Sequence, residues 1–167
     1  MKIPIFVSSP TSLSDAQEAS RKLIIRELDR LDLEPRALGR SDYPTELPLR
    51  EVQVIAKRCS GGVILGFEQF QATAGIVKRN AEGERIIDKP VSFPSAWNHL
   101  EAGILYSLGL PILVFKEDGI TGGVFDDGAT DVFVHKMPST SLSLPEKKAL
   151  SSVFLKWQSL VRASYYK

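Results

Sequence analysis

The 167-residue sequence has few side chains that could close a disulfide or hold a metal: one cysteine, Cys59, and two histidines, His99 and His135. A lone cysteine cannot form an internal disulfide. The three side chains are also too far apart in the chain for any common metal-ligand spacing. Cys59 falls on the apolar side of a predicted helix, where we expect it to pack. The sequence therefore predicts neither a metal site nor a cofactor.

The chain also lacks an excess of either charge and a long apolar run. It has 21 Lys and Arg against 20 Asp and Glu, a formal net charge of +1, and the two signs are interspersed. This balance argues against a nucleic-acid or membrane-surface partner. No apolar run approaches the twenty residues of a membrane span, and no charged-then-apolar leader is visible. We expect a soluble cytoplasmic protein.

Short apolar runs alternate with helical patterns along the chain. The predicted strands are Ile5 to Ser8, Pro35 to Gly39, Val63 to Phe67, Ile112 to Phe115 and Val132 to Val134. Capping boxes at Ser14 with Gln17 and at Ser143 with Glu146 mark two helix starts, Pro48 and Ser95 mark two more, and Arg40 to Pro44 is an expected exposed loop. This alternation predicts one α/β domain over residues 1–167. We expect three layers, with a mostly parallel five-stranded sheet of flavodoxin-like order 2-1-3-4-5 and helices on both faces.

The stretch from residue 68 to 94 interrupts this alternation. Connections in α/β units usually span about 2 to 6 residues, so a segment of this length is a lid or an insertion with structure of its own. Ile76-Val77 and Ile86-Ile87 flank Glu82-Gly83. We therefore predict a hairpin with its turn near Glu82 and Gly83.

The predicted helix from Ser95 to Gly109 contains one carboxylate, Glu101. Helical spacing places Glu101 in the middle of an apolar stripe and puts His99 on the opposite, exposed side; the stripe consists of Trp97, Leu100, Ile104, Leu105 and Leu108. Glu101 is six residues past Ser95, too far for a capping box or a strong helix-dipole contact. A buried ion pair or a snorkelling side chain would be a structural explanation. We favour a functional one, because buried carboxylates are rare unless paired or functional.

Sheets of this class bind ligands beyond the carboxyl ends of their strands, at the switch point between strands one and three. Several predicted segments end at that edge of the sheet, next to the helix that carries Glu101. The candidate substrate-binding residues are Ser8 and Ser9 after strand one, Phe67 and Glu68 after strand three, Lys116 after strand four, and Trp97 and Asn98 at the helix start.

Two parts of the same stretch resemble known families. Ser95-Ala-Trp97-Asn-His-Leu-Glu101 is similar to the serine, tryptophan and glutamate pattern of TIR domains, and Ile5-Phe-Val-Ser-Ser9 resembles their first strand and loop. Glu101-Ala-Gly103, followed by Gly109-Leu-Pro111, resembles nucleoside deoxyribosyltransferases. Both families have flavodoxin-like sheets and a catalytic glutamate at this position. The resemblance implies that Glu101 is catalytic, that the protein forms homo-oligomers, and, by analogy with TIR proteins, a role in bacterial defence or signalling.

Both families cleave the bond between a ribose carbon and a ring nitrogen through a transition state with oxocarbenium character. One carboxylate can stabilise that charge or attack the sugar, and it suffices when nicotinamide leaves NAD. Departure of a purine or pyrimidine benefits from a second acid, for which the sequence offers Glu68 or Asp42. We therefore expect an N-glycosidase acting on NAD or a related nucleotide. A non-catalytic nucleotide sensor or assembly module, and a nucleoside deoxyribosyltransferase, remain the alternatives.

Overall fold

The computed structural model describes residues 2–42 and 45–167. Its centre is a parallel sheet of five strands in the order β2-β1-β3-β8-β9. These strands are β1 (Ile3–Ser8), β2 (Leu33–Arg36), β3 (Gly62–Gly66), β8 (Ile112–Lys116) and β9 (Val134–Lys136). Since β8 and β9 are the fourth and fifth strands of this sheet, the order is the predicted 2-1-3-4-5. The fold is flavodoxin-like in kind, as the alternating pattern predicts.

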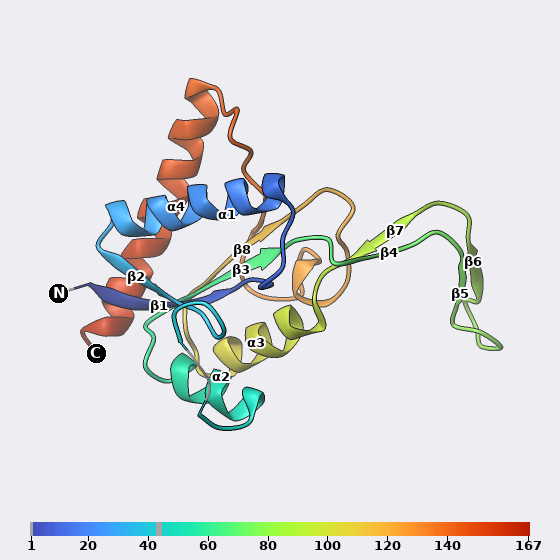
Figure 1. Cartoon of the computed structure of the whole chain (residues 1–167), viewed down its shortest axis with the longest axis horizontal. Coiled ribbons are helices and arrows are strands. Elements are labelled where there is room, and N and C mark those ends of the chain that lie inside the picture. Colours follow the sequence, from blue (N-terminus) through green and yellow to red (C-terminus); the bar gives the residue numbers. More distant parts are fainter. Residues whose placement is uncertain (1, 43–44) are drawn as a thin grey trace.

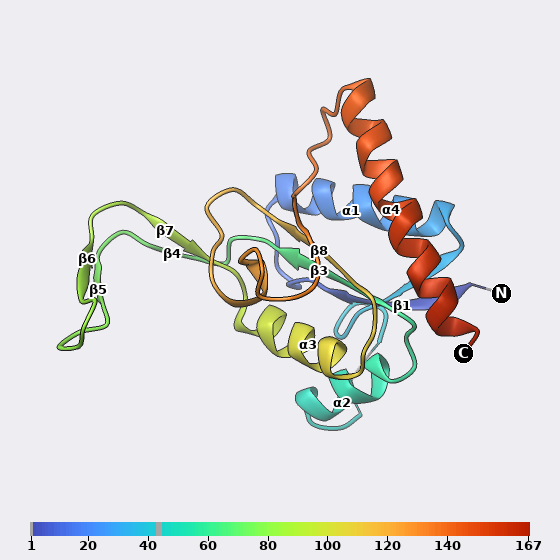
Figure 2. The same ribbon diagram turned by 180° about the vertical axis from the view of Figure 1, so that it is seen from behind.

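Helices cover both faces of the sheet (Figures 1 and 2). On one face, α1 (Asp15–Arg30) and α4 (Leu144–Tyr165) pack over a core cluster that includes Ile5 and Val63. On the other face, α2 (Pro48–Ala56) and α3 (Ala96–Ser107) pack over a second cluster that includes Phe6 and Ile64. Successive side chains of one strand point to opposite faces of the sheet, so they belong to different clusters. Within the described residues, no helix is both long and apolar enough to cross a membrane.

Several element boundaries differ from the prediction. The first strand begins at Ile3 and includes Pro4. Pro4 has no backbone N–H, but no hydrogen bond to β3 is lost, because β1 pairs with β3 only from Phe6 onward. The second strand starts earlier than predicted, at Leu33, and the fifth starts later, at Val134. Both predicted capping boxes are present, at Ser14 with Gln17 and at Ser143 with Glu146. In the predicted loop from Arg40 to Pro44, Tyr43 and Pro44 lie outside the described residues.

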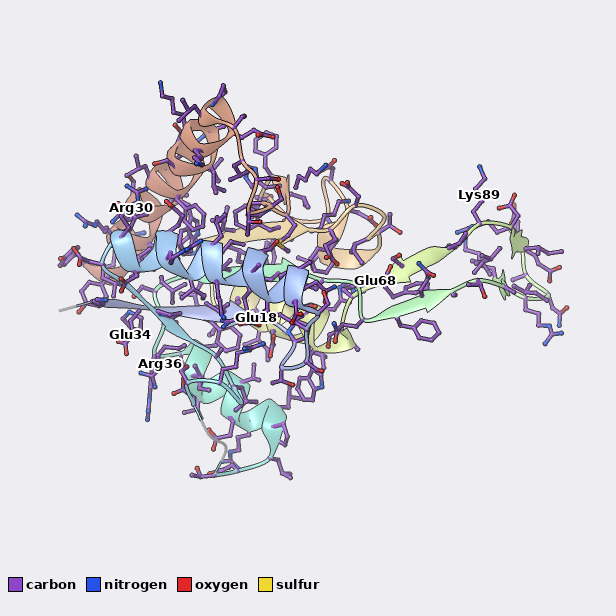
Figure 3. All side chains as sticks on the ribbon, turned by 45° about the horizontal axis from the view of Figure 1, so that its top comes forward. Glu18, Arg30, Glu34, Arg36, Glu68 and Lys89 are labelled. Atoms are coloured by element: carbon purple, nitrogen blue, oxygen red, sulfur yellow. The ribbon has the colours of Figure 1, made fainter. Side chains whose placement is uncertain are left out.

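Residues 70–93 form a projecting arm built from two short antiparallel ladders. At its base β4 (Phe70–Ala72) pairs with β7 (Val91–Phe93), and farther out β5 (Gly75–Val77) pairs with β6 (Arg85–Ile87). The predicted hairpin is confirmed, since Ile76 lies opposite Ile86. The arm points away from the body, on the side opposite both termini (Figure 1), and Figure 3 shows Glu68 near its base and Lys89 near its outer end. No arm residue belongs to either core cluster.

Helix α3 is rotated relative to the predicted apolar stripe. Its buried residues are Asn98, Glu101, Ala102 and Leu105, whereas Trp97, Leu100 and Leu108 are exposed. The prediction that this whole stripe faces the core is therefore wrong, although Glu101 does point inward. Leu105 packs directly over Gly62 of β3, where an added Cβ would lie 2.5 Å from Leu105 Cδ1. His99 is only partly exposed and packs edge-on against Phe125 of the short helix η1 (Gly123–Phe125), with ring centroids 5.5 Å apart.

Candidate functional site

A cavity of about 400 Å³ lies at the carboxyl ends of β1, β2 and β3. Loops that follow these three strands form one wall, and the first turns of α3 form another. The lining residues are Ser9, Pro10, Thr11, Ser12, Leu38, Gly39, Pro48, Gln69, Ser95, Trp97, Asn98 and Glu101. The cavity thus lies at the edge of the sheet where folds of this class bind ligands.

Glu101 is the buried carboxylate of this cavity, with a residue exposure of 9%. Burial raises the pKa of the Glu101 carboxyl from 4.5 to about 7, and a hydrogen bond from the Ser8 hydroxyl opposes that rise. Desolvation disfavours the charged form, whereas a donor to the carboxylate favours it. Near neutral pH the two forms of Glu101 are therefore present in comparable amounts.

A buried amide connects Glu101 to the sheet. Asn98 lies one turn before Glu101 on the same buried face of α3 and is 1% exposed. Its Nδ2 atom donates to Ser8 Oγ at 2.8 Å and to the carbonyl oxygen of Leu65 at 3.3 Å. Ser8 is at the end of β1 and Leu65 is in β3. One side chain of α3 is thus bonded to two neighbouring strands directly behind the cavity.

Arg40 fixes the loop that forms the opposite wall. Its guanidinium donates to the carbonyl oxygens of Pro10 at 2.9 Å and Thr11 at 3.2 Å, and it is paired with Glu18 of α1 at 3.3 Å. Arg40 follows β2, while Pro10 and Thr11 follow β1. The loops after two strands are therefore held together, which keeps this wall of the cavity in place.

The predicted site residues fall into two groups. Ser9, Trp97, Asn98 and Glu101 line the cavity, with Ser8 fully buried behind them. The other three lie elsewhere: Phe67, Glu68 and Lys116. Phe67 is fully buried in the core cluster beneath α1 and α4. Glu68 accepts a hydrogen bond from Ser92 of the arm, and Lys116 Nζ donates to the carbonyl oxygen of Phe125 at 3.0 Å.

The two carboxylates considered as second acids also have partners outside the cavity. Glu68 lies beside Glu117, whose carboxylate accepts the Glu68 backbone N–H at 2.6 Å and the Gln17 side chain at 3.0 Å. Asp42 is paired with Arg36, which holds the pKa of the Asp42 carboxyl below its usual value. Among the described residues that line the cavity, Glu101 is the one ionisable side chain.

Eight lining residues are absent from the sequence-based site: Pro10, Thr11, Ser12, Leu38, Gly39, Pro48, Gln69 and Ser95. Thr11 and Ser12 extend the polar loop after strand one, so they could have been included with Ser9. Leu38 and Gly39 follow strand two, and the predicted strand order already placed that strand beside strand one. Pro48 and Ser95 were predicted as helix starts only, and Gln69 carries no local signal in the sequence.

Within the described residues, no group of three or more His, Cys, Asp or Glu side chains is placed to hold a metal ion. The sequence matches no protein-family model, no curated protein and no solved structure in the three comparisons made.

Proposed function

We propose that the protein cleaves the bond between ribose and base in NAD or a related nucleotide, with Glu101 as the catalytic carboxylate. The observation that carries this proposal is a buried carboxylate, with no ion-pair partner among the described residues, in a cavity whose other described lining residues are uncharged. A carboxylate in such a place can stabilise an oxocarbenium ion strongly, because little water screens its charge.

A cationic substrate suits this carboxylate best. Burial keeps Glu101 partly protonated near neutral pH, and a positive charge brought beside it favours the ionised form. The nicotinamide ring of NAD carries such a charge and leaves as a neutral molecule, so its departure requires no second acid. A purine or pyrimidine would need a proton donor. The single ionisable group among the described lining residues therefore favours nicotinamide as the leaving group.

Other lining residues supply contacts for the rest of such a substrate. Trp97 is exposed beside Glu101 and offers an aromatic surface for a ring. Ser9, Thr11 and Ser12 offer hydroxyls for ribose or phosphate oxygens. Assembly into homo-oligomers is part of the proposal, because the resemblance to TIR domains implies association.

The test is incubation with NAD, NADP, nucleosides and nucleoside monophosphates over a range of protein concentrations, with products separated by chromatography. We expect free nicotinamide from NAD or NADP, and none with Glu101→Gln. Glu82→Gln, on the exposed outer part of the arm, is the matched control and should retain full activity. Saturable nucleotide binding by calorimetry without any product would instead select the non-catalytic sensor. Equal turnover by wild type and Glu101→Gln would exclude Glu101 as the catalytic group.

A further inference from the structure

The outward face of α3 carries no charged side chain. Residues 96–107 include no Lys, Arg or Asp, and their one Glu, Glu101, is buried. By contrast, α1, α2 and α4 each expose charges, for example Lys22, Arg50 and Lys156. The solvent face of a helix in a globular protein is normally charged or polar. The outward face of α3 is therefore unlike those of the other helices.

Large apolar side chains occupy this face instead. Leu100 is 48% exposed near its centre, and helical spacing places the exposed Trp97 on one flank and the exposed Tyr106 on the other. Scattered apolar side chains on a surface need no explanation, whereas a contiguous apolar patch marks an interaction site. The exposed side of α3 thus has the composition of a surface that another molecule covers.

Gly103 lies on the same face and is not required by the packing of a single copy. It is exposed, and a Cβ added to it would meet no atom within 4 Å. Its φ is not positive, so the backbone does not require glycine either. Glycine inside a helix is destabilising relative to alanine. One copy alone gives no reason for this glycine, but the close approach of a second helix would.

Four residues form the outer seam of α3: Ala96, Leu100, Gly103 and Ser107, all exposed. Their spacing of four, three and four residues is that of the a and d positions of a coiled coil. If a second α3 packs antiparallel about a two-fold axis, Leu100 lies against the partner's Gly103, and Ala96 lies against the partner's Ser107. The one large side chain of the seam then meets the one residue that has no side chain. The Ser107 hydroxyl already donates to the Ile104 carbonyl oxygen at 2.8 Å, so covering it leaves that donor satisfied.

We infer that two copies of the protein associate through the outer seams of α3, packed antiparallel. The seam is complementary to itself, and it offers no charge that would select a partner of another kind. This inference deepens the proposed function, on which it rests for the expectation of homo-oligomers, and it names the surface on which they form. No seam residue lines the cavity, so each copy keeps a complete site.

The interface is small, because α3 has 12 residues, so we expect a dissociation constant on the order of 10 μM. The test is sedimentation velocity without nucleotide, from roughly 1 μM to roughly 1 mM protein. Wild type should show a reversible equilibrium between monomer and dimer. Gly103→Leu fills the space that the partner's Leu100 enters, and Leu100→Ala removes the side chain that enters it. Each should raise the dissociation constant about 10-fold or more.

A double variant tests the complementarity itself. Combining Leu100→Gly with Gly103→Leu exchanges the large and the small position, so each leucine again faces a glycine of the other copy. This double variant should dimerise more tightly than Gly103→Leu alone. Independent effects of the two changes could not produce that result, because each removes a contact of the wild-type seam.

Gly103→Ala separates the interface from the stability of one copy. It should raise the midpoint of thermal unfolding of the monomer by about 2–4 °C, because alanine favours the helix. It should also weaken the dimer, because the partner's Leu100 has less room. Leu155→Ala is the matched control, since Leu155 on α4 is 47% exposed, and it should leave the dissociation constant unchanged.

Three results would overturn the inference: a wild-type protein that stays monomeric at the highest concentration, a dimer that neither Gly103→Leu nor Leu100→Ala weakens, or a double variant that dimerises less than both single variants. Sedimentation requires no turnover, so its outcome is independent of cleavage. A protein that dimerises as expected and leaves NAD intact would keep the α3 interface and lose the proposed activity. Cleavage by a protein that is always monomeric would do the reverse.

Discussion

Trp97 and Glu101 lie one turn apart on α3 and line the same cavity, yet Trp97 is 41% exposed and Glu101 is 9% exposed. The difference arises because the buried face of α3 is centred on Glu101 and Ala102, which leaves Trp97 at its edge. An aromatic ring that is open to solvent on one side can receive another ring, while the buried carboxylate keeps its charge away from water. Separate measurements can test these two properties.

The burial of Glu101 predicts a pH-dependent stability difference between wild type and Glu101→Gln. The folded protein holds the Glu101 proton more tightly than the unfolded chain, because the pKa rises from 4.5 to about 7 on folding. Stability from this group is therefore fully present below pH 4.5 and is lost as the pH rises to about 7. One pKa unit corresponds to about 1.4 kcal/mol, so the Gln variant should gain about 3 kcal/mol relative to wild type across this range.

Denaturant unfolding of both proteins from pH 4 to 8 measures this difference. Glu146→Gln is a control of opposite sign, since a hydrogen bond from the Ser143 side chain lowers the pKa of the exposed Glu146 carboxyl. Wild type should be the more stable of these two proteins above pH 4.5, and its advantage should shrink as the pH falls below 4.5. A constant difference between wild type and Glu101→Gln at all pH values would show that Glu101 is not desolvated in the folded protein.

The exposure of Trp97 predicts that its removal affects ligands more than stability. Stacking of a base on an aromatic side chain is worth about 1–3 kcal/mol, so Trp97→Ala should weaken nucleotide binding or lower kcat/KM by about 10-fold or more. Leu100→Ala is the matched control, because Leu100 is 48% exposed on the same helix and does not line the cavity. Calorimetry measures the binding affinity, and initial rates give kcat/KM. Equal effects of the two substitutions would show that Trp97 does not contact the ligand.

The rotation of α3 predicts a contrast between two leucines three residues apart. Leu105 is fully buried over Gly62, so Leu105→Ala should cost about 2–5 kcal/mol of unfolding free energy. Leu108 is exposed, so Leu108→Ala should cost less than about 1 kcal/mol. Urea unfolding of both variants measures the two costs. A large cost for both substitutions would mean that the predicted apolar stripe does face the core.

The arm predicts tolerance to shortening. Ala72 and Val91 lie directly opposite each other in the inner ladder, so an Asn-Gly turn can join them in place of residues 73–90. The shortened protein should keep its unfolding free energy within about 0.5 kcal/mol, since the removed residues contribute nothing to either core cluster. The measurements are denaturant unfolding and a titration of the Glu101 carboxyl. A large loss of unfolding free energy, or a changed pKa of Glu101, would show that the outer arm stabilises the body.

The fold could be predicted from the sequence because strands and helices alternate with strong boundary signals. The two capping boxes, the apolar strand after Gly62 and the isoleucine pairs of the arm each depend on residues close together in the chain. Boundaries were less predictable where a neighbouring strand decides them. Pro4 can lie within β1 because β3 does not pair with β1 at this position, so no hydrogen bond to β3 is lost. This register depends on a strand almost sixty residues away in the sequence.

The candidate site was predictable in its centre and less so around it. Periodicity found Glu101, but it grouped Trp97 and Leu100 with the core because it counted apolar side chains alone. The rotation that buries Asn98 depends on acceptors in β1 and β3 and on the space above Gly62, which no local pattern reports. Similarly, the loop after β2 enters the cavity because Arg40 bonds to the loop after β1.

The outer ladder of the arm has a consequence for solubility. β5 and β6 pair with each other, so each has a second edge with backbone groups that another chain could extend, and Ile76 and Ile86 are exposed there. Exposed charges lie within or next to these strands: Lys78, Arg79, Glu82, Glu84, Arg85 and Asp88 are all open to solvent. Charges in these positions oppose the stacking of strands into aggregates. The same residues that make the tip polar therefore protect an open strand edge from self-association into fibres.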